Sequence, residues 1–204
     1  MEQILPGVYH WATFHEGIGE EVHSALITGL DPPALIDPRV PEQGLEVIAQ
    51  LCRPQHAYLT NRHHYRHSPS FRDAYGTQIW CHRAGLHEFP DDSLVHPFEH
   101  GDELPGGIVA LPVGELCPEE TALFIPLAGG VLALGDAVIR YQDELLFVPD
   151  FLLGDDPVAV RRGLRQSLRK LLEVDFDHLL FAHGPPWIGG GRERLRRFVD
   201  GSRP

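Results

Sequence analysis

The chain has 204 residues, of which 43% are hydrophobic and 23% charged, and its formal net charge is −12. This length is enough to bury a sizeable core, and the composition is typical of a globular protein. The negative charge argues against nucleic acid or an anionic membrane as the main partner, because both would repel the chain.

Short apolar runs separated by turns predict alternating strands and helices in the first half of the chain. Strands are expected over 22–29, 34–37, 57–60 and 77–81, and helices over 42–52 and 68–75. In the first of these helices one face is expected to be buried, consisting of Leu45, Ile48, Ala49 and Cys52. A strand followed by a loop, a helix and a strand is an α/β pattern, and the loop after such a strand is a common place for a site.

The second half repeats this alternation. Strands are expected over 107–113, 121–127, 130–139 and 177–183, and helices over 157–174 and 192–199. In helix 157–174, Pro157 suits the first helical position and Asp156 can cap it. Its buried stripe is expected to be Val160, Leu164, Leu168 and Leu171. Together the two halves predict one α/β domain over 1–204, an αββα sandwich in which two mixed sheets are flanked by helices.

The cysteines and the N-terminal residues predict an intracellular protein. Cys52, Cys81 and Cys117 are odd in number and widely spaced, as expected of reduced thiols rather than a disulfide framework. The start "MEQILPGVYHW" does not resemble a signal peptide, and no apolar run approaches the roughly 18 residues that span a bilayer. We therefore expect a cytoplasmic location and no membrane partner.

Polar side chains that could bind a metal follow four of the predicted strands. They are found in the segment 61–67 ("NRHHYRH") and at Glu115, Asp136 and His183. Burying such groups is costly unless they are paired or bind a ligand. A single histidine at a strand end is more often a hydrogen-bonded structural residue, but four such strand ends in one small domain predict a shared site.

The order of these segments resembles the metallo-β-lactamase superfamily. The pattern of that family is a strand followed by Thr-His-x-His-x-Asp-His, then Gly-His, Gly-Asp and His-Gly. The corresponding segments are "YLTNRHHYRHS", "LPVGELCPEETALFIP", "GGVLALGDAVI" and "DHLLFAHGPP", and upstream "LPGVYHW", "SALITG" and "ALIDPR" resemble the opening strands. The resemblance runs nearly end to end. It implies the αββα sandwich and a metal-dependent hydrolase.

The first motif departs from the family where it should bind metal. In the simplest register Asn61 stands at the first His and His63 at the second, whereas Tyr65 replaces the Asp and Arg66 the third His. A guanidinium has no lone pair to offer and would repel a cation. The resemblance implies a two-metal site in the family, and these changes predict that the second metal is lost here.

The other motifs are better kept, so a site for a single metal remains one alternative. Glu115 replaces the Gly-His histidine, while Asp136 and His183 are retained. The predicted ligands are His63, Glu115, Asp136 and His183, with Asn61, His64 and His67 as possible additional ones. Such a set suits Zn, Mn or Fe. The other alternative is a metal-free site in which Arg62 and Arg66 pair with Glu115 and Asp136.

We therefore expect a divergent hydrolase-like protein with at most one metal, acting on an ester, thioester, amide or phosphoester of a small anionic molecule. Asp136 would position the reacting water, and Arg66 with Tyr65 would stabilise negative charge on the substrate oxygen. The alternative is a catalytically silent binding or regulatory protein that uses the same cleft. Pairing of Arg66 with Asp136 would favour the silent protein. An oxidoreductase with an iron pair is disfavoured by the lost ligands.

Overall fold

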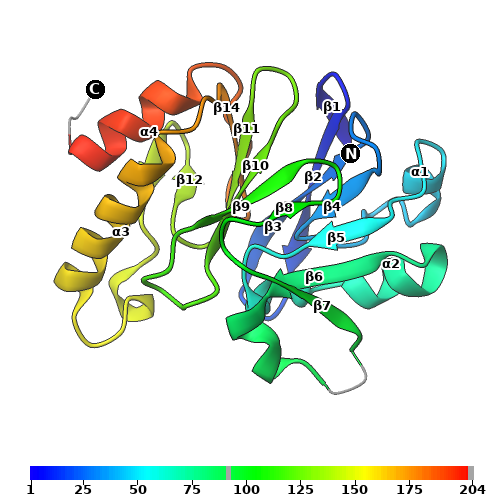
Figure 1. Ribbon diagram of the computed structural model, residues 1–204, viewed down its shortest axis with the longest axis horizontal. Coiled ribbons are helices and arrows are strands. Elements are labelled where there is room, and N and C mark those ends of the chain that lie inside the picture. Colours follow the sequence, from blue (N-terminus) through cyan, green and yellow to red (C-terminus); the bar gives the residue numbers. More distant parts are fainter. Residues whose placement is uncertain (91–92, 202–204) are drawn as a thin grey trace.

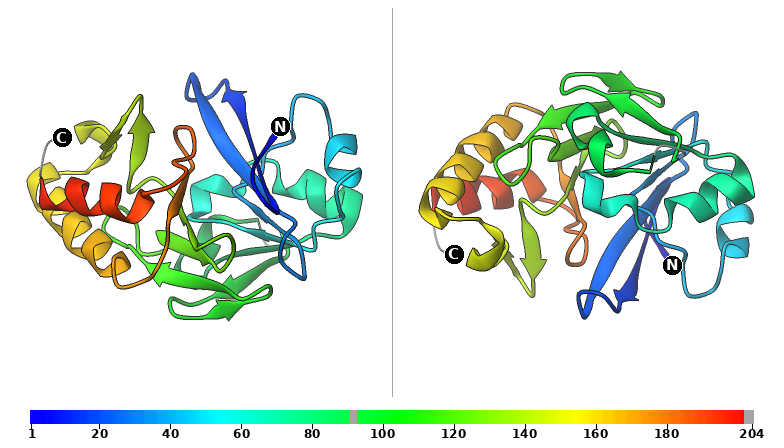
Figure 2. Two further views of the ribbon diagram at one scale, coloured as in Figure 1. Left: turned by 90° about the horizontal axis from the view of Figure 1, so that it is seen from above. Right: turned by 90° about the horizontal axis from the view of Figure 1, so that it is seen from below.

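Two β-sheets lie face to face at the centre of the molecule, with helices on both outer faces (Figures 1 and 2). This computed structural model describes residues 1–90 and 93–201. The first sheet has seven strands in chain order, β1 to β7, and the second has the order β14-β11-β10-β9-β8; β12 and β13 form a separate hairpin. The predicted αββα sandwich is confirmed.

The first sheet changes from antiparallel to parallel along its length. Its strands are β1 (Glu2–Leu5), β2 (Val8–His15), β3 (Glu20–Ile27), β4 (Ala34–Ile36), β5 (His56–Tyr58), β6 (Gln78–His82) and β7 (Val95–Phe98). The pairs from β1 to β4 are antiparallel, and those from β4 to β7 are parallel. The carboxyl ends of β4 and β5 therefore meet at one edge, and the histidine-rich loop begins there.

The second sheet brings two distant segments to the same edge. Its strands are β8 (Glu103–Leu104), β9 (Ile108–Pro112), β10 (Thr121–Ile125), β11 (Val131–Leu134) and β14 (His178–Phe181), and the hairpin consists of β12 (Ile139–Tyr141) and β13 (Glu144–Leu146). Because β11 and β14 are parallel neighbours, the chain leaves both at the same end. The predicted strand 130–139 was too long, since β11 stops at Leu134 and the Gly135–Asp136 turn follows.

Helices cover the two outer faces. α1 (Glu46–Ala49) and α2 (Ser68–Tyr75) lie on the first sheet, and α3 (Pro157–Leu171) and α4 (Gly191–Asp200) lie on the second (Figure 1). The 3-10 helices among the described residues are η1 (Arg62–Tyr65), η2 (Arg83–Glu88) and η3 (Asp150–Leu152). Within the described ranges no helix is both long and apolar enough to cross a bilayer.

Two of the predicted helices illustrate what local sequence determines. In α3, Asp156 accepts a hydrogen bond from the Ala159 N–H at 2.9 Å, and the predicted stripe is buried, with Val160 partly so. The helix predicted over 42–52 was wrong in extent, and only one turn forms. Gly44 takes a positive φ of 86° just before it, a conformation that interrupts a right-handed helix. Ile48 is buried there, but Ala49 is exposed, contrary to the expected face.

Most of the core lies in three apolar layers, and a small fourth cluster consists of Leu59, Ile79 and Cys81. Between the sheets lie residues such as Ile27, Tyr58 and Leu123. Between the second sheet and its helices lie Leu164 and Leu195 among others. The third layer, between the first sheet and its helices, consists of Trp11, Leu26, Leu35, Ile48, Ala57 and Phe71. A strand with both faces covered reads as a continuous apolar run, which explains "ALI" at the end of β3.

Candidate metal centre

The histidine-rich loop continues after β5 as η1, a short 3-10 segment with a kink at His64, where φ is −91° and ψ is 18°. Asn61 caps it, because its side-chain oxygen accepts a hydrogen bond from the His63 N–H at 2.9 Å. With about three residues per turn, successive side chains point in different directions. His63 is exposed, whereas His64 is 4% exposed and faces the space between the sheets. His64, rather than His63, therefore points into the candidate site.

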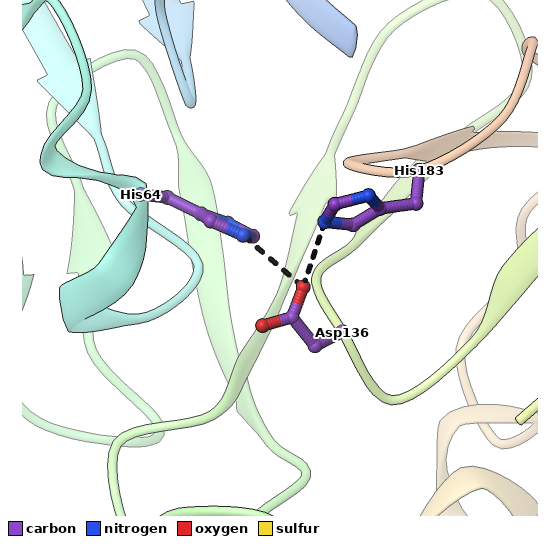
Figure 3. Close-up of side chains that lie close together, drawn as sticks. All are labelled: His64, Asp136 and His183. Carbon is purple, nitrogen blue, oxygen red and sulfur yellow. Dashed lines mark hydrogen bonds and ion pairs between the residues drawn. The ribbon is translucent and has the colours of Figure 1, made fainter. Parts of the chain in front are cut away.

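Three side chains that can bind a metal converge at this edge (Figure 3). His64 Nε2 lies 3.1 Å from Asp136 Oδ1, and His183 Nε2 lies 3.2 Å from the same oxygen. Their candidate ligand atoms are all within 4.8 Å of one another, and no other group of three is as close in the described part of the chain. Asp136 comes from the turn after β11 and His183 from the residues after β14. The parallel pairing of these strands brings the two together.

A second carboxylate orients His64 from behind. Its Nδ1 lies 3.0 Å from Asp37 Oδ2 and 2.8 Å from the Thr60 hydroxyl, and Asp37 also accepts a hydrogen bond from the Thr60 N–H at 2.8 Å. Burial alone would lower the pKa of His64, but Asp37 and Asp136 outweigh it and raise that pKa to about 9. A carboxylate behind a histidine is the usual device for fixing the ring of a metal ligand.

Glu120 belongs to the site and was missed at the sequence level. Its side chain is fully buried just before β10, and Oε2 accepts a hydrogen bond from Asn61 Nδ2 at 3.0 Å. The same Asn61 nitrogen donates to Asp136 Oδ2 at 3.0 Å. Burial and the charge of Asp136 raise the pKa of Glu120 to about 8. The feature of the sequence that could have identified it is that Glu120 directly precedes the apolar strand "TALFI".

The structure places three of the predicted ligands outside this group. His63 is exposed, and Glu115 is exposed with its carboxylate against Gly163 of α3. His67 accepts a hydrogen bond from the Val40 N–H at 3.1 Å, which directs its ring toward the loop after β4. Of the predicted ligands, the structure brings together Asp136, His183 and the additional candidate His64, and the Asn61 amide N–H donates a hydrogen bond to Asp136.

Arg66 and Tyr65 are engaged elsewhere. The Arg66 guanidinium donates to the backbone carbonyls of His23 at 2.7 Å and Asp37 at 2.8 Å, and it lies 3.5 Å from that of Ala182. The Tyr65 ring packs against Phe89 with the ring centroids 5.1 Å apart. The arginine is therefore turned toward backbone carbonyls, the arrangement expected if Asp136 is to remain accessible to a metal.

The pairing expected for a metal-free site does not form as predicted. Arg62 contacts Glu119 through Nη1 and lies 2.7 Å from Glu88 through Nε, instead of pairing with Glu115. Arg66 uses carbonyls in place of Asp136. The physical reason is that the 3-10 turn directs Arg62 toward η2 and leaves the exposed Glu115 on the far side, beside α3.

The three converging side chains form one group of candidate ligands, which fits a single metal ion. Two imidazole nitrogens and a carboxylate oxygen are a donor set that suits Zn, Mn or Fe. Neighbouring donors 3.1 and 3.2 Å apart are compatible with ligands each about 2.1 Å from one ion. The guanidinium of Arg66 offers no ligand for a second ion. The mononuclear fit rests on His64, Asp136 and His183.

Known proteins resemble this chain in structure more than in sequence. No family model matches the sequence, and no curated protein matches it. A metallo-β-lactamase family protein from Thermus thermophilus is 18% identical, with 98% of this chain and 80% of that chain covered and a TM-score of 0.65. An archaeal metallo-β-lactamase superfamily protein from Sulfolobus tokodaii is 13% identical over 96% and 85%, with a TM-score of 0.68. A protein solved in a di-iron-bound form is 22% identical over 90% and 96%, with a TM-score of 0.66. Likeness at these identities establishes the fold.

Proposed function

We propose that this chain, which has the metallo-β-lactamase fold, is a hydrolase-like protein with one divalent metal ion, Zn, Mn or Fe. The observation that carries the proposal is the convergence of His64, Asp136 and His183 on one point at the edge between the sheets. Its substrate would be an ester, thioester, amide or phosphoester of a small anionic molecule. A bound metal would supply a Lewis acid and lower the pKa of a coordinated water.

The surrounding residues hold the donor atoms in place. Asp37 fixes the ring of His64 through Nδ1, which leaves Nε2 directed at the site. Asn61 donates to Asp136 Oδ2 and leaves Oδ1 facing the two imidazoles. Arg66 lies close behind with its donors used on carbonyls, so its support for an anionic substrate comes from its charge rather than from a direct hydrogen bond.

A second candidate, a metal-free binding or regulatory protein, is favoured by one specific observation. Both ring nitrogens of His64 face carboxylates, Asp37 on one side and Asp136 on the other. A cationic His64 together with Arg66 would balance these two negative charges without any metal. In this case the cleft would hold a small anion without chemistry.

Metal content distinguishes the two candidates. Purified wild-type protein is incubated with zinc, manganese or iron, dialysed and analysed by elemental mass spectrometry. The proposal expects about one equivalent in the wild type, since the group offers a single ligand set. His64→Ala and Asp136→Ala are expected to lose it, whereas the exposed neighbours His63→Ala and Glu115→Ala keep it.

Two results would contradict the proposal. Absence of metal under every loading condition would favour the metal-free candidate. Loss of metal in H63A but not in H64A would show that His63, rather than His64, is the ligand from this loop. If one metal binds, the loaded protein is assayed with model esters, thioesters, amides and phosphoesters, and D136A serves as the inactive reference.

A further inference from the structure

We infer that Glu120 is a positioning residue of the candidate metal centre, because its buried carboxyl group joins the Asn61 amide to the turn that carries Asp136. This inference rests on the proposed function, and it concerns the direction in which Asp136 presents Oδ1 to His64 and His183. Neither the family pattern at the Gly-His segment nor the predicted Glu115 anticipates this role.

Both oxygens of Glu120 are used. Oε1 accepts a hydrogen bond from the Ala137 N–H at 3.0 Å, and Oε2 accepts one from Asn61 Nδ2 at 3.0 Å. Ala137 follows Asp136 directly in the chain, so its N–H belongs to the peptide unit whose orientation sets the Asp136 side chain. Asn61, which is bound to Glu120, also donates a hydrogen bond to Asp136 Oδ2. One carboxyl group thus restrains Asp136 from two directions.

Glu120 packs closely against the backbone of the Gly135–Asp136 turn. A Cβ atom added at Gly135 would lie 2.7 Å from Glu120 Oε1 and 2.7 Å from Thr60 Oγ1, closer than real Cβ contacts. Glycine at this position lets Glu120 approach the backbone of the turn. The backbone of Glu120 is itself fixed, since its carbonyl accepts hydrogen bonds from the Val113 and Gly114 N–H groups at 3.1 and 3.0 Å.

The polarity of the contacts requires a carboxyl group rather than an amide. Ala137 and Asn61 both present N–H donors, so both terminal atoms of residue 120 must accept. A glutamine has the same shape but only one accepting oxygen, and its NH₂ group would face a donor. Glu120→Gln therefore breaks one of the two restraints on Asp136 while leaving the volume unchanged.

The test compares wild type, E120Q and the exposed control E115Q by two measurements. In metal-free protein, the imidazole ¹⁵N signals of His64 and His183 report their contacts with Asp136. In zinc-loaded protein, competition with a chromophoric chelator gives the affinity. E120Q is expected to move both histidine signals and to weaken zinc binding about 10- to 100-fold, the range known for groups that orient metal ligands. E115Q is expected to change neither.

The outcomes separate this inference from the proposed function. If wild type binds neither zinc, manganese nor iron, the proposed function fails, while the imidazole signals of metal-free E120Q still decide whether Glu120 positions Asp136. Unchanged signals in folded E120Q would overturn the inference. If E120Q does not fold, Glu120→Asp keeps the carboxyl group but shortens its reach, so that it is expected to meet only one of the two donors. Shifted histidine signals in E120D would then support the inference, and wild-type signals would overturn it.

Discussion

At the scale of single residues, the imidazole of His64 lies between two carboxyl groups and is almost fully buried. Asp37 meets one ring nitrogen and Asp136 the other. Its neighbour His63 is exposed and contributes its backbone N–H to the Asn61 cap. The two neighbouring histidines of η1 differ in the direction of their side chains. A substitution of exposed His63 is therefore a control for the same substitution of buried His64.

We predict that His64→Ala destabilises the metal-free protein far more than His63→Ala. Removing His64 leaves Asp37 and Asp136 without the group that lies between them, which costs about 3 kcal/mol of unfolding free energy by comparison with broken buried pairs. H63A is expected to stay within about 0.5 kcal/mol of wild type, as exposed substitutions usually do. Urea unfolding followed by tryptophan fluorescence measures both. Equal effects would show that His64 is not held as described.

The same two histidines show how far sequence could locate the site. Asp136 and His183 were identified because each follows an apolar strand, and strand ends at one sheet edge must lie near one another. His63 and Glu115 were chosen from the register of the family motifs, although Glu115 also follows a predicted strand. The direction of a side chain on η1 depends on non-repeating backbone angles, such as the φ of 44° at Arg66, which leave no periodic signal. Glu120 was missed because glutamates near a strand start are commonly exposed.

At the scale of elements, β2 and β3 carry a buried pair of histidines behind the site. His10 Nε2 lies 2.8 Å from His23 Nδ1, and the rings stack with centroids 5.0 Å apart. The antiparallel register places His10 opposite Ala25 and His23 opposite Ala12, so the two rings are diagonal neighbours on one face. With Asp37 they line a cavity of about 10 Å³, room for roughly one water.

We predict that this pair makes the protein sensitive to mild acid. Burial lowers the pKa of His10 to about 4 and that of His23 to about 3. The unfolded chain binds protons at about pH 6.5 and below, whereas the folded pair resists them. Stability from the pair is therefore complete above about 6.5 and is lost as pH falls toward 4. His10→Gln is expected to reduce the loss between about pH 7.5 and 5 by about 2 kcal/mol.

Urea titrations of wild type, H10Q and the exposed control His87→Gln at both pH values provide the measurement. H87Q should retain the wild-type acid sensitivity. An identical pH dependence in H10Q and wild type would contradict the assignment of the acid sensitivity to the β2–β3 pair.

The helices differ in how well their bounds could be predicted from the sequence. The bounds of α2 were predicted correctly, and α3 followed its stripe of leucines closely, because each shows consistent periodicity and a clear start. The segment 42–52 has an apolar face too, but Gly44 and the short span before Pro54 limit it to one turn. Local pattern predicts a helix where it extends over several turns, and it fails where one backbone conformation interrupts it.

At the scale of the whole molecule, the two sheets are joined directly at the site edge. Arg66 donates to carbonyls of the first sheet side, at His23 and Asp37, and lies 3.5 Å from the carbonyl of Ala182 beyond β14. Backbone hydrogen bonds run across as well, from the His23 N–H to the Ala182 carbonyl at 2.9 Å and from the Thr121 N–H to the Thr60 carbonyl at 2.8 Å. The site edge is therefore a polar seam, by which we mean this set of hydrogen bonds between the two sheets, next to the apolar layer that fills much of the interface.

We predict that Arg66→Lys loosens this seam although it keeps the charge. An ammonium group cannot reproduce the planar fork that reaches several carbonyls at once. The expected cost is about 2 kcal/mol, because buried carbonyls lose a charged donor. Urea unfolding gives the cost, and hydrogen exchange at the His23 and Thr121 amides locates it. The exposed Arg162→Lys is the matched control and should leave both unchanged. Wild-type protection in R66K would contradict the seam.

The parallel pairing of β14 with β11 also determines when the candidate metal centre can assemble during translation. Strand β11 is complete long before β14 leaves the ribosome, since a hairpin, a 3-10 turn and α3 are made between them. Until then β11 remains an open edge. Asp136 emerges with it, but its partner His183 comes after the final strand. An unpaired β11 edge is therefore expected for the whole interval, and the candidate metal centre stays incomplete until His183 has been made.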